Sequence, residues 1–161
     1  GWSMTYRSRY QKILVPLDGS GWAQRAVPHA VDIARAHNAE LILLHIFRPP
    51  AHEFADQIAL AGQDAQIQAA REQMKQYLIG VRSELRHEDL KVRTHMTEGM
   101  DIAHLICDFV RAEEVDLVVM STHGRSGIVR LMFGSVAHEV MRCVDVPVML
   151  VKPDDHEESG K

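Results

Sequence analysis

Five short strand-like runs separated by helix-like segments constrain the fold of this chain more than any other feature. The runs lie at residues 12–17, 40–47, 91–97, 115–120 and 146–151. Most of them are continuously apolar, which is typical of parallel strands that are covered on both faces. Between them, apolar residues recur at the three- and four-residue spacing of amphipathic helices. This alternation predicts an α/β fold: a doubly wound, mostly parallel five-stranded sheet with helices on both faces.

Two of these runs carry the signals of edge strands. In the run 91–97, Val92 and Met96 point to one side while Arg93 and His95 point to the other, as in a half-exposed strand. Pro147, near the start of the last run, cannot donate an N–H to a sheet ladder and so favours an edge position.

Capping residues and glycines mark the ends of the predicted helices. The first helix follows Gly21 and is expected to end at Asn38 as a left-handed C-cap. A long connection over residues 51–62 precedes a second helix over residues 67–85. Asp101 is expected to cap the third helix, and Gly134-Ser135 opens the fourth.

Length and composition indicate one globular domain. The chain has 161 residues, of which 46% are hydrophobic and 25% charged, an ordinary globular mixture. We predict a tag remnant (Gly1-Trp2-Ser3, before Met4) and a flexible N-terminus over residues 1–9, a domain over residues 10–152, and a disordered polar tail over residues 153–161.

Charge and hydropathy exclude some classes of partner. The formal net charge is −4 and the pI about 6.2, which argues against a general nucleic-acid-binding protein. The sequence contains neither a signal-peptide pattern nor an apolar stretch long enough to span a membrane. We therefore expect a soluble, cytoplasmic protein with no membrane partner.

Cysteines and histidines do not form a metal-binding pattern. Cys107 and Cys143 both lie in apolar, helix-like surroundings, which favours two buried free thiols and leaves a disulfide as the alternative. The ten histidines are scattered, without His-x-x-x-His or Cys-x-x-Cys spacing, so no metal site is assigned. His123, in a glycine-rich segment, is expected to fix that loop by a hydrogen bond.

Residues that follow the predicted strands form a candidate ligand site. In doubly wound sheets, ligands bind beyond the carboxyl ends of the strands, where the strand order reverses. Asp18, Ile46 and Ser121 lie at or just past strand ends and should converge there. Asp18 can accept hydrogen bonds from ribose hydroxyls or an adenine amine, and the alternative is a structural role as a helix-capping Asp in a turn.

The segment from Ser121 to Ser135 has the features of a phosphate site. A buried strand, glycines and a helix start follow one another, and unpaired N–H groups at a helix start attract anions. Gly124 and Gly127 can wrap a phosphate or simply make a tight turn. Ser135 can act as N-cap, phosphate ligand or both, and a bulky residue at Gly134 is expected to block the phosphate while the fold is retained. Neither the P-loop pattern nor the dinucleotide fingerprint is present.

These motifs together resemble the universal stress protein family. The resemblance is carried by residues 15–20, 43–46, 118–127, 134–137 and 146–151. It implies a Rossmann-like fold of the adenine nucleotide alpha hydrolase type. The family's ATP-binding pattern, Gly-x2-Gly-x9-Gly-Ser/Thr, matches Gly124, Gly134 and Ser135, whereas Ser121 stands at the first glycine. Serine is small and can donate a hydrogen bond, but it disfavours a positive φ.

The resemblance also implies a ligand, a site and an assembly. The ligand would be ATP, with Mg²⁺ as an optional companion, and the last strand, residues 146–151, would pair across a homodimer axis. The implied nucleotide-binding residues are Pro16, Leu17, Asp18, Ile46, Met120, Ser121, His123, Gly124, Arg125, Gly127, Gly134, Ser135 and Val136.

Three functions are compatible with these residues. The first is a stress or signalling protein that binds ATP with slow or no hydrolysis. The second is a dimeric interaction module without nucleotide, favoured by Ser121 and by the apolar residues within 128–133. The third is an ATPase or phosphotransferase, for which only Asp18 or His123 could activate water, and no catalytic residue is assigned.

Overall fold

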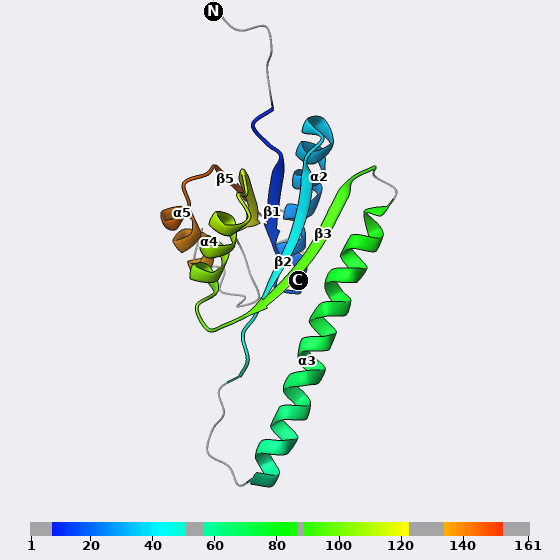
Figure 1. The fold of residues 1–161 in the computed structure, drawn as a ribbon, viewed down its shortest axis with the longest axis vertical. Coiled ribbons are helices and arrows are strands. Elements are labelled where there is room, and N and C mark those ends of the chain that lie inside the picture. Colours follow the sequence, from blue (N-terminus) through cyan, green and yellow to red (C-terminus); the bar gives the residue numbers. More distant parts are fainter. Residues whose placement is uncertain (1–7, 51–56, 87–88, 123–133, 153–161) are drawn as a thin grey trace, which may run out of the picture.

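The structure, a computed structural model, describes residues 8–50, 57–86, 89–122 and 134–152 (Figure 1). The predicted tail, 153–161, lies outside these residues. The elements in chain order are β1 (Lys12–Pro16), α1 (Gly21–Gln24), α2 (Ala26–His37), β2 (Glu40–Phe47), α3 (Gln57–Glu84), β3 (Lys91–Glu98), α4 (Ile102–Ala112), β4 (Leu117–Ser121), α5 (Ser135–Cys143) and β5 (Val148–Val151).

The five strands form one sheet in the order β3-β2-β1-β4-β5. All four neighbouring pairs are parallel. The chain therefore builds outward from β1 in one direction to β3, then returns and builds in the other direction to β5. The predicted α/β fold with a doubly wound parallel sheet is confirmed.

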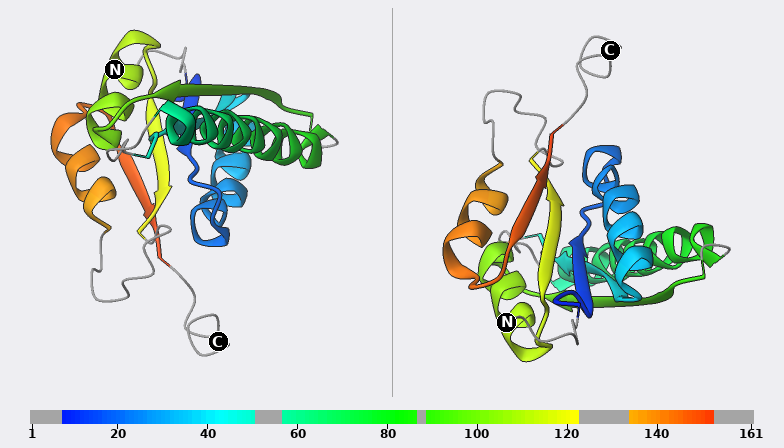
Figure 2. Two further views of the ribbon diagram at one scale, coloured as in Figure 1. Left: turned by 90° about the horizontal axis from the view of Figure 1, so that it is seen from below. Right: turned by 90° about the horizontal axis from the view of Figure 1, so that it is seen from above.

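Helices cover both faces of the sheet (Figure 2). One core lies under α2 and α3 and includes Ile13 and Val15 of β1, whereas the other lies under α4 and α5 and includes Leu14. Alternate residues of the same strand thus enter opposite cores, and both sets are fully buried. This explains why the strand sequences are continuously apolar.

The two predicted edge strands are confirmed. β3 and β5 lie at opposite ends of the sheet. β5 begins at Val148, directly after Pro147, and the Pro147 carbonyl still accepts a hydrogen bond from the N–H of Val118 at 3.1 Å. A proline can thus stand beside the sheet because only its carbonyl is needed there.

The predicted helix caps at Asn38 and Asp101 are also confirmed. Asn38 is the left-handed C-cap of α2, with φ 55°. The Asp101 carboxylate accepts a hydrogen bond from the N–H of His104 at 3.1 Å. The first helix, however, is divided into α1 and α2 at Arg25. Pro28 has no N–H to donate to the carbonyl of Gln24, which interrupts the helical ladder at this point.

Helix α3 begins earlier than predicted. It starts at Gln57, inside the region expected to be a connection, and runs for 28 residues. Figure 1 shows that its first turns extend past the end of the sheet. Among its described side chains, Ile67 is the first that is buried. Residues 51–62 show only weak helical periodicity in the sequence, and therefore the pattern did not indicate where the helix begins.

The favoured interpretation of two free thiols was wrong. Cys107 of α4 is joined to Cys143 of α5 by a disulfide, with a Cα–Cα distance of 6.1 Å. Adjacent helices on one face of the sheet bring the two residues together, although they are 36 positions apart in sequence. Closing a loop of this length typically stabilises a protein by about 2–4 kcal/mol.

No helix among the described residues is long and apolar enough to cross a membrane.

We expect Asp101→Ala to lower the free energy of unfolding by about 1 kcal/mol, because it removes the side-chain acceptor at the start of α4. Chemical denaturation would measure this. Asp108→Ala is the matched control, since Asp108 makes exposed contacts with His104 and Arg111 on the same helix and should cost no more than about 0.5 kcal/mol. Equal losses in the two variants would contradict the capping role.

Candidate functional site

The order in which the chain adds strands to the sheet reverses between β1 and β4. Helices α2 and α3 cover one face and α4 and α5 cover the other, so α2, which follows β1, and α5, which follows β4, lie on opposite sides of the sheet. Ile13 pairs with Leu117 and Leu14 with Val118 in the parallel register, so both strands end at the same edge of the sheet. This edge is where open α/β sheets place their ligands.

The turn after β1 is held firmly by β2. The N–H of Leu17 donates to the carbonyl of Leu44 at 2.8 Å. The carbonyl oxygen of Leu17 lies 2.7 Å from Nδ1 of His45, a side chain that is itself buried. Both backbone groups of Leu17 are therefore engaged, and the residue that follows, Asp18, leaves the sheet from a fixed point.

Asp18 organises the turn that opens α1. Its Oδ1 accepts hydrogen bonds from the N–H of Ser20 at 2.9 Å and from the Ser20 hydroxyl at 2.5 Å. The Ser20 oxygen in turn caps α1 by accepting from the N–H of Ala23 at 3.0 Å. Gly19 between them has φ +89°, which strains any other residue. The structural role of Asp18 is thus realised through Ser20, and Asp18 is not itself the cap.

Helix α3 contributes to this turn, which the sequence analysis missed. A Cβ atom at Gly19 would lie 3.2 Å from the terminal methyl of Met74. The Tyr77 hydroxyl donates to Oε1 of Gln24 at 3.3 Å. Burial, followed by the charges of Asp18 and Glu84, raises the pKa of Tyr77 to about 12. In the sequence, Met74 and Tyr77 belonged to an apolar stripe, and nothing in that stripe distinguished residues near the site from residues of the core.

The start of α5 is attached to the end of β4. The N–H of Gly134 donates to the carbonyl of Thr122 at 2.6 Å, and the N–H of Thr122 donates to the carbonyl of Val151 at 3.1 Å. A Cβ at Gly134 would lie 2.9 Å from the Thr122 oxygen. Because that oxygen belongs to the backbone, a larger residue would displace the helix start even without a ligand. The expectation that a bulky substitution here blocks the phosphate while the fold is retained stays a prediction, to which the structure adds a local shift of the helix start.

The N-cap of α5 is Gly134, not Ser135. Helix α5 begins at Ser135, and the cap makes no side-chain hydrogen bond. Ser135 is exposed in the first turn, where no acidic residue is present. The interpretation of Ser135 as N-cap was wrong, because the close approach of the backbone to Thr122 requires glycine at the capping position. Ser135 is instead the first residue of the helix.

Ser121 fits its position without backbone strain. It is the last residue of β4 and is buried. The described non-glycine residues with positive φ are Asn38, Asp89 and Glu114, so Ser121 does not require the conformation that serine disfavours. A serine at the first glycine position of the motif is therefore compatible with this fold.

The described site residues fall into two groups. Ile46 and Met120 belong to the core under α4 and α5, and Val136 packs against it. Leu17 belongs to the opposite core, and Pro16, half-buried, ends β1. The remaining members of the predicted site, His123, Gly124, Arg125 and Gly127, lie outside the described residues, as does the apolar run within 128–133.

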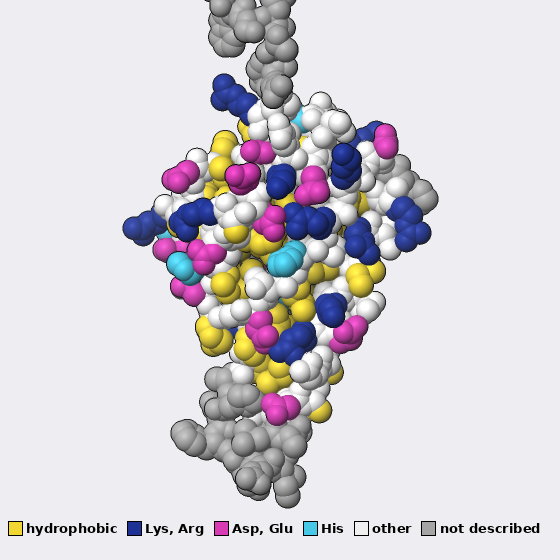
Figure 3. Space-filling model, viewed as in Figure 1, with side chains coloured by type: hydrophobic (Ala, Val, Ile, Leu, Met, Phe, Trp, Pro, Cys, Tyr) yellow, Lys and Arg dark blue, Asp and Glu magenta, His cyan; other side chains and the backbone are white. Residues whose placement is uncertain are grey.

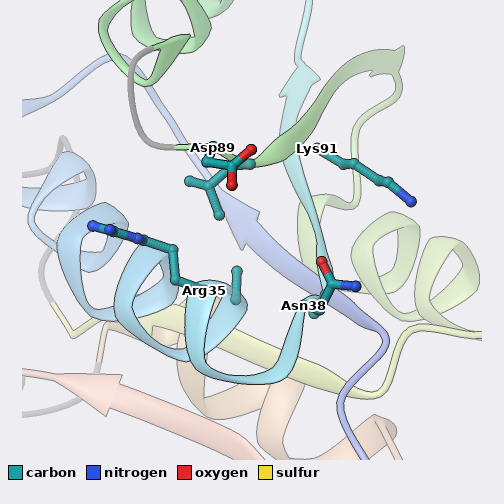
Figure 4. A pocket seen from close by; sticks show the side chains of 7 residues that line it. Arg35, Asn38, Asp89 and Lys91 are labelled. Carbon is teal, nitrogen blue, oxygen red and sulfur yellow. The ribbon is translucent and has the colours of Figure 1, made fainter.

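A pocket of about 380 Å³ lies at the other end of the sheet. It is lined by the end of α2 and the starts of β2 and β3, among them Arg35, Asn38, Asp89 and Lys91. Figure 4 shows the Arg35 and Lys91 side chains extending in opposite directions. The two cations do not converge on a common point. This arrangement gives no focus of charge for an anionic ligand.

Charges are mixed on the face of the molecule that carries β3 (Figure 3). Arg71 pairs with Glu98 at 2.6 Å, and Arg93 pairs with Glu40 at 3.3 Å and Glu113 at 3.6 Å. Basic side chains on this face thus lie beside acidic ones rather than forming a patch of one sign. In the part of the chain that the structure describes, no group of three or more His, Cys, Asp or Glu residues could hold a metal ion.

Comparison with known proteins agrees with the architecture. The model of the universal stress protein family matches residues 9–152. A universal stress protein of Methanocaldococcus jannaschii is 31% identical over 143 residues, which cover 89% of this chain and 82% of that protein. The structure of the universal stress protein UspA from Lactobacillus plantarum has a TM-score of 0.70 and 28% identity, covering 90% of this chain and 99% of the other.

A third comparison concerns a structure with a ligand. The universal stress protein from Archaeoglobus fulgidus in complex with dAMP has a TM-score of 0.63 and 23% identity, covering 90% of this chain and 100% of that one. At this identity the likeness is one of fold.

The fold is an open α/β sheet, and its candidate site lies at the carboxyl ends of β1 and β4, where the strand order reverses. The chain belongs to the universal stress protein family.

The raised pKa of Tyr77 predicts a loss of stability at high pH. Between pH 10 and 12 the unfolded chain releases the phenol proton while the folded protein retains it. Stability contributed by this group is thus fully present below pH 10 and is lost as the pH rises toward 12. The difference in unfolding free energy between the wild type and Tyr77→Phe should be constant below pH 10 and change above it. Parallel curves across this range would contradict the burial of the phenol.

Proposed function

We propose that this protein binds an adenine nucleotide, ATP with or without Mg²⁺, as a stress-response or signalling ligand with slow or no hydrolysis. The observation that carries the proposal is the hydrogen bond of 2.6 Å from Gly134 to Thr122. It holds a helix start without a side-chain cap beside the end of β4, at the reversal point of the sheet. Such helix starts attract phosphate groups.

The phosphates are assigned to the first turn of α5. The first N–H groups of a helix have no partner within it, so those of α5 and the exposed Ser135 hydroxyl can serve as donors, and no acidic residue in that turn opposes an anion. Gly134 leaves no side chain between the backbone and the ligand. The proposed phosphate segment lies within the domain over residues 10–152. Its remaining members are Ser121, His123, Gly124, Arg125 and Gly127.

The base and ribose are assigned to the strand ends. Ile46 and Met120 belong to one core and Val136 packs against it, and apolar side chains of this kind suit the faces of an adenine ring. Asp18 is the acceptor assigned to ribose hydroxyls or the adenine amine. Its position at the end of β1, next to Pro16 and Leu17, is fixed by the contacts of Leu17 with β2. The dAMP complex of the Archaeoglobus fulgidus protein supports an adenine nucleotide as a ligand that this fold accommodates.

We propose a ligand role rather than rapid turnover because Asp18, one of the two candidates for activating water, is assigned as a hydrogen-bond acceptor and not as a base, while His123, the other, lies outside the described residues. Oδ1 of Asp18 accepts two hydrogen bonds from Ser20, so it is committed to the turn. Activation of water requires a base placed against the attacking atom. We therefore assign no catalytic residue and expect phosphate release from ATP to be slow or absent.

Calorimetric titration with Mg-ATP tests the site. Asp18→Ala and Ser135→Ala should each weaken binding about tenfold, because each removes a hydrogen bond to the ligand worth about 1.4 kcal/mol. Asp32→Ala is the matched control, since Asp32 is an exposed carboxylate on α2. The affinity of this variant for Mg-ATP should equal that of the wild type.

Two results would contradict the proposal. Absence of both heat and thermal stabilisation at millimolar Mg-ATP in the wild type would favour a nucleotide-free interaction module of the same fold. Unchanged affinity in Ser135→Ala and Asp18→Ala, with binding intact, would show that the nucleotide lies elsewhere on the protein.

We also propose that the protein forms a homodimer through its last strand, residues 146–151. β5 is an edge strand, and in a parallel ladder only alternate residues direct their backbone groups inward. The outward groups form a template for pairing with a second strand. Met149 of β5 is 38% exposed and adds apolar surface at this edge.

Met149→Lys should shift the protein from dimer to monomer in analytical ultracentrifugation, because a charged residue on an edge strand opposes pairing. Met100→Lys is the matched control: Met100 is 53% exposed but precedes α4, away from β5. The control should remain a dimer. If Met149→Lys dimerises as strongly as the control, the interface does not include β5.

A further inference from the structure

We propose that the Cys107–Cys143 disulfide is a reversible redox switch that controls the phosphate-binding start of α5. The two cysteines join the adjacent helices α4 and α5. The loop that the bond closes contains β4, Ser121 and Gly134-Ser135, which are parts of the proposed nucleotide site. The effect on ligand binding rests on the proposed function, whereas the redox reaction and its effect on α5 do not.

Helix α5 is held by a short apolar face and by attachments at its two ends, and Val136 and Cys143 pack against the same core as its buried residues. It has nine residues, of which Ala137 and Val140 are buried. Its start is fixed by the Gly134–Thr122 hydrogen bond. Its end is fixed by the disulfide and by a hydrogen bond of 3.2 Å from Arg111 to the carbonyl of Cys143. A helix this short is not stable without tertiary contacts, so loss of the covalent attachment affects the whole helix, including its first turn.

The two cysteines differ in exposure. Cys107 lies within α4 and is 1% exposed, whereas Cys143 is the last residue of α5 and is only half-buried. Thiol–disulfide exchange requires direct approach of a thiolate to the sulfur under attack. We therefore assign Cys143, the more exposed of the two residues, as the one that a reductant attacks, and Cys107 as the leaving group.

Reduction by a dithiol proceeds in two exchanges. A thiolate of the dithiol attacks the Cys143 sulfur, the protein disulfide breaks, and the bonding electron pair leaves with the Cys107 sulfur, which takes up a proton. The second thiolate of the dithiol then displaces Cys143 from the mixed disulfide, and Cys143 takes up the second proton. The dithiol becomes a disulfide, having given two electrons and two protons to the protein. An oxidised glutathione pool reverses the reaction.

Two single-cysteine variants test the assignment of the accessible sulfur. With oxidised glutathione, Cys107→Ala, which retains Cys143, should form a mixed disulfide at least tenfold faster than Cys143→Ala, which retains the buried Cys107. Mass spectrometry of the intact folded protein measures both rates. Equal rates, or faster reaction of Cys107, would overturn the assignment.

The switch itself is tested by poising the wild type in glutathione buffers and counting thiols after denaturation. Both thiols should appear together, as expected for a two-electron couple, and the reduced form should show faster hydrogen exchange in α5 than the oxidised form. Cys143→Ala should match the reduced form in every buffer. Thiols that never pair, or an exchange rate in α5 that does not depend on the redox state, would overturn the proposal.

Mg-ATP titration then measures the coupling. The oxidised form should bind at least threefold more tightly than the reduced form, and the affinity of Cys143→Ala should not respond to the buffer. Equal affinities of the two redox forms would overturn control of the nucleotide site. If neither form binds Mg-ATP, the proposed function fails, while thiol counting and hydrogen exchange still decide whether the disulfide controls α5.

Discussion

Burial of β1 on both of its faces is the constraint on which the rest of the structure depends. Ile13 and Val15 enter one core and Leu14 the other, and all three are completely buried. A strand of this kind cannot lie at a surface, so it requires neighbouring strands on both sides and helices on both faces. Placing β2 on one side of β1 and β4 on the other satisfies this requirement.

The reversal of strand order follows from that central position, and the candidate site follows from the reversal. The helices that follow β1 and β4 in the chain lie on opposite faces of the sheet, and the carboxyl ends of both strands lie at the same edge. Backbone hydrogen bonds then fix the two walls of the site: Leu17 is held by β2, and Gly134 is held by Thr122. The polar groups proposed to contact a nucleotide are thus positioned by the sheet rather than by one another.

Sequence patterns predicted the elements that have local physical causes. The helix caps at Asn38 and Asp101 depend on one or two residues and were identified correctly. The division between α1 and α2 at Arg25 was missed, although the missing N–H of Pro28 is its cause. The early start of α3 was missed because the residues before Ile67 show only weak helical periodicity.

By itself, the sequence determined the α/β class, the edge positions of β3 and β5, and the family motif that ends at Gly134-Ser135. These properties depend on hydrophobic pattern and local chemistry, which are written along the chain. Only the tertiary structure decided that Cys107 meets Cys143, that α3 packs against the Asp18 turn, and that Gly134 is required by the Thr122 carbonyl. Those contacts join residues that are distant in the chain, and their existence depends on how helices settle on the sheet.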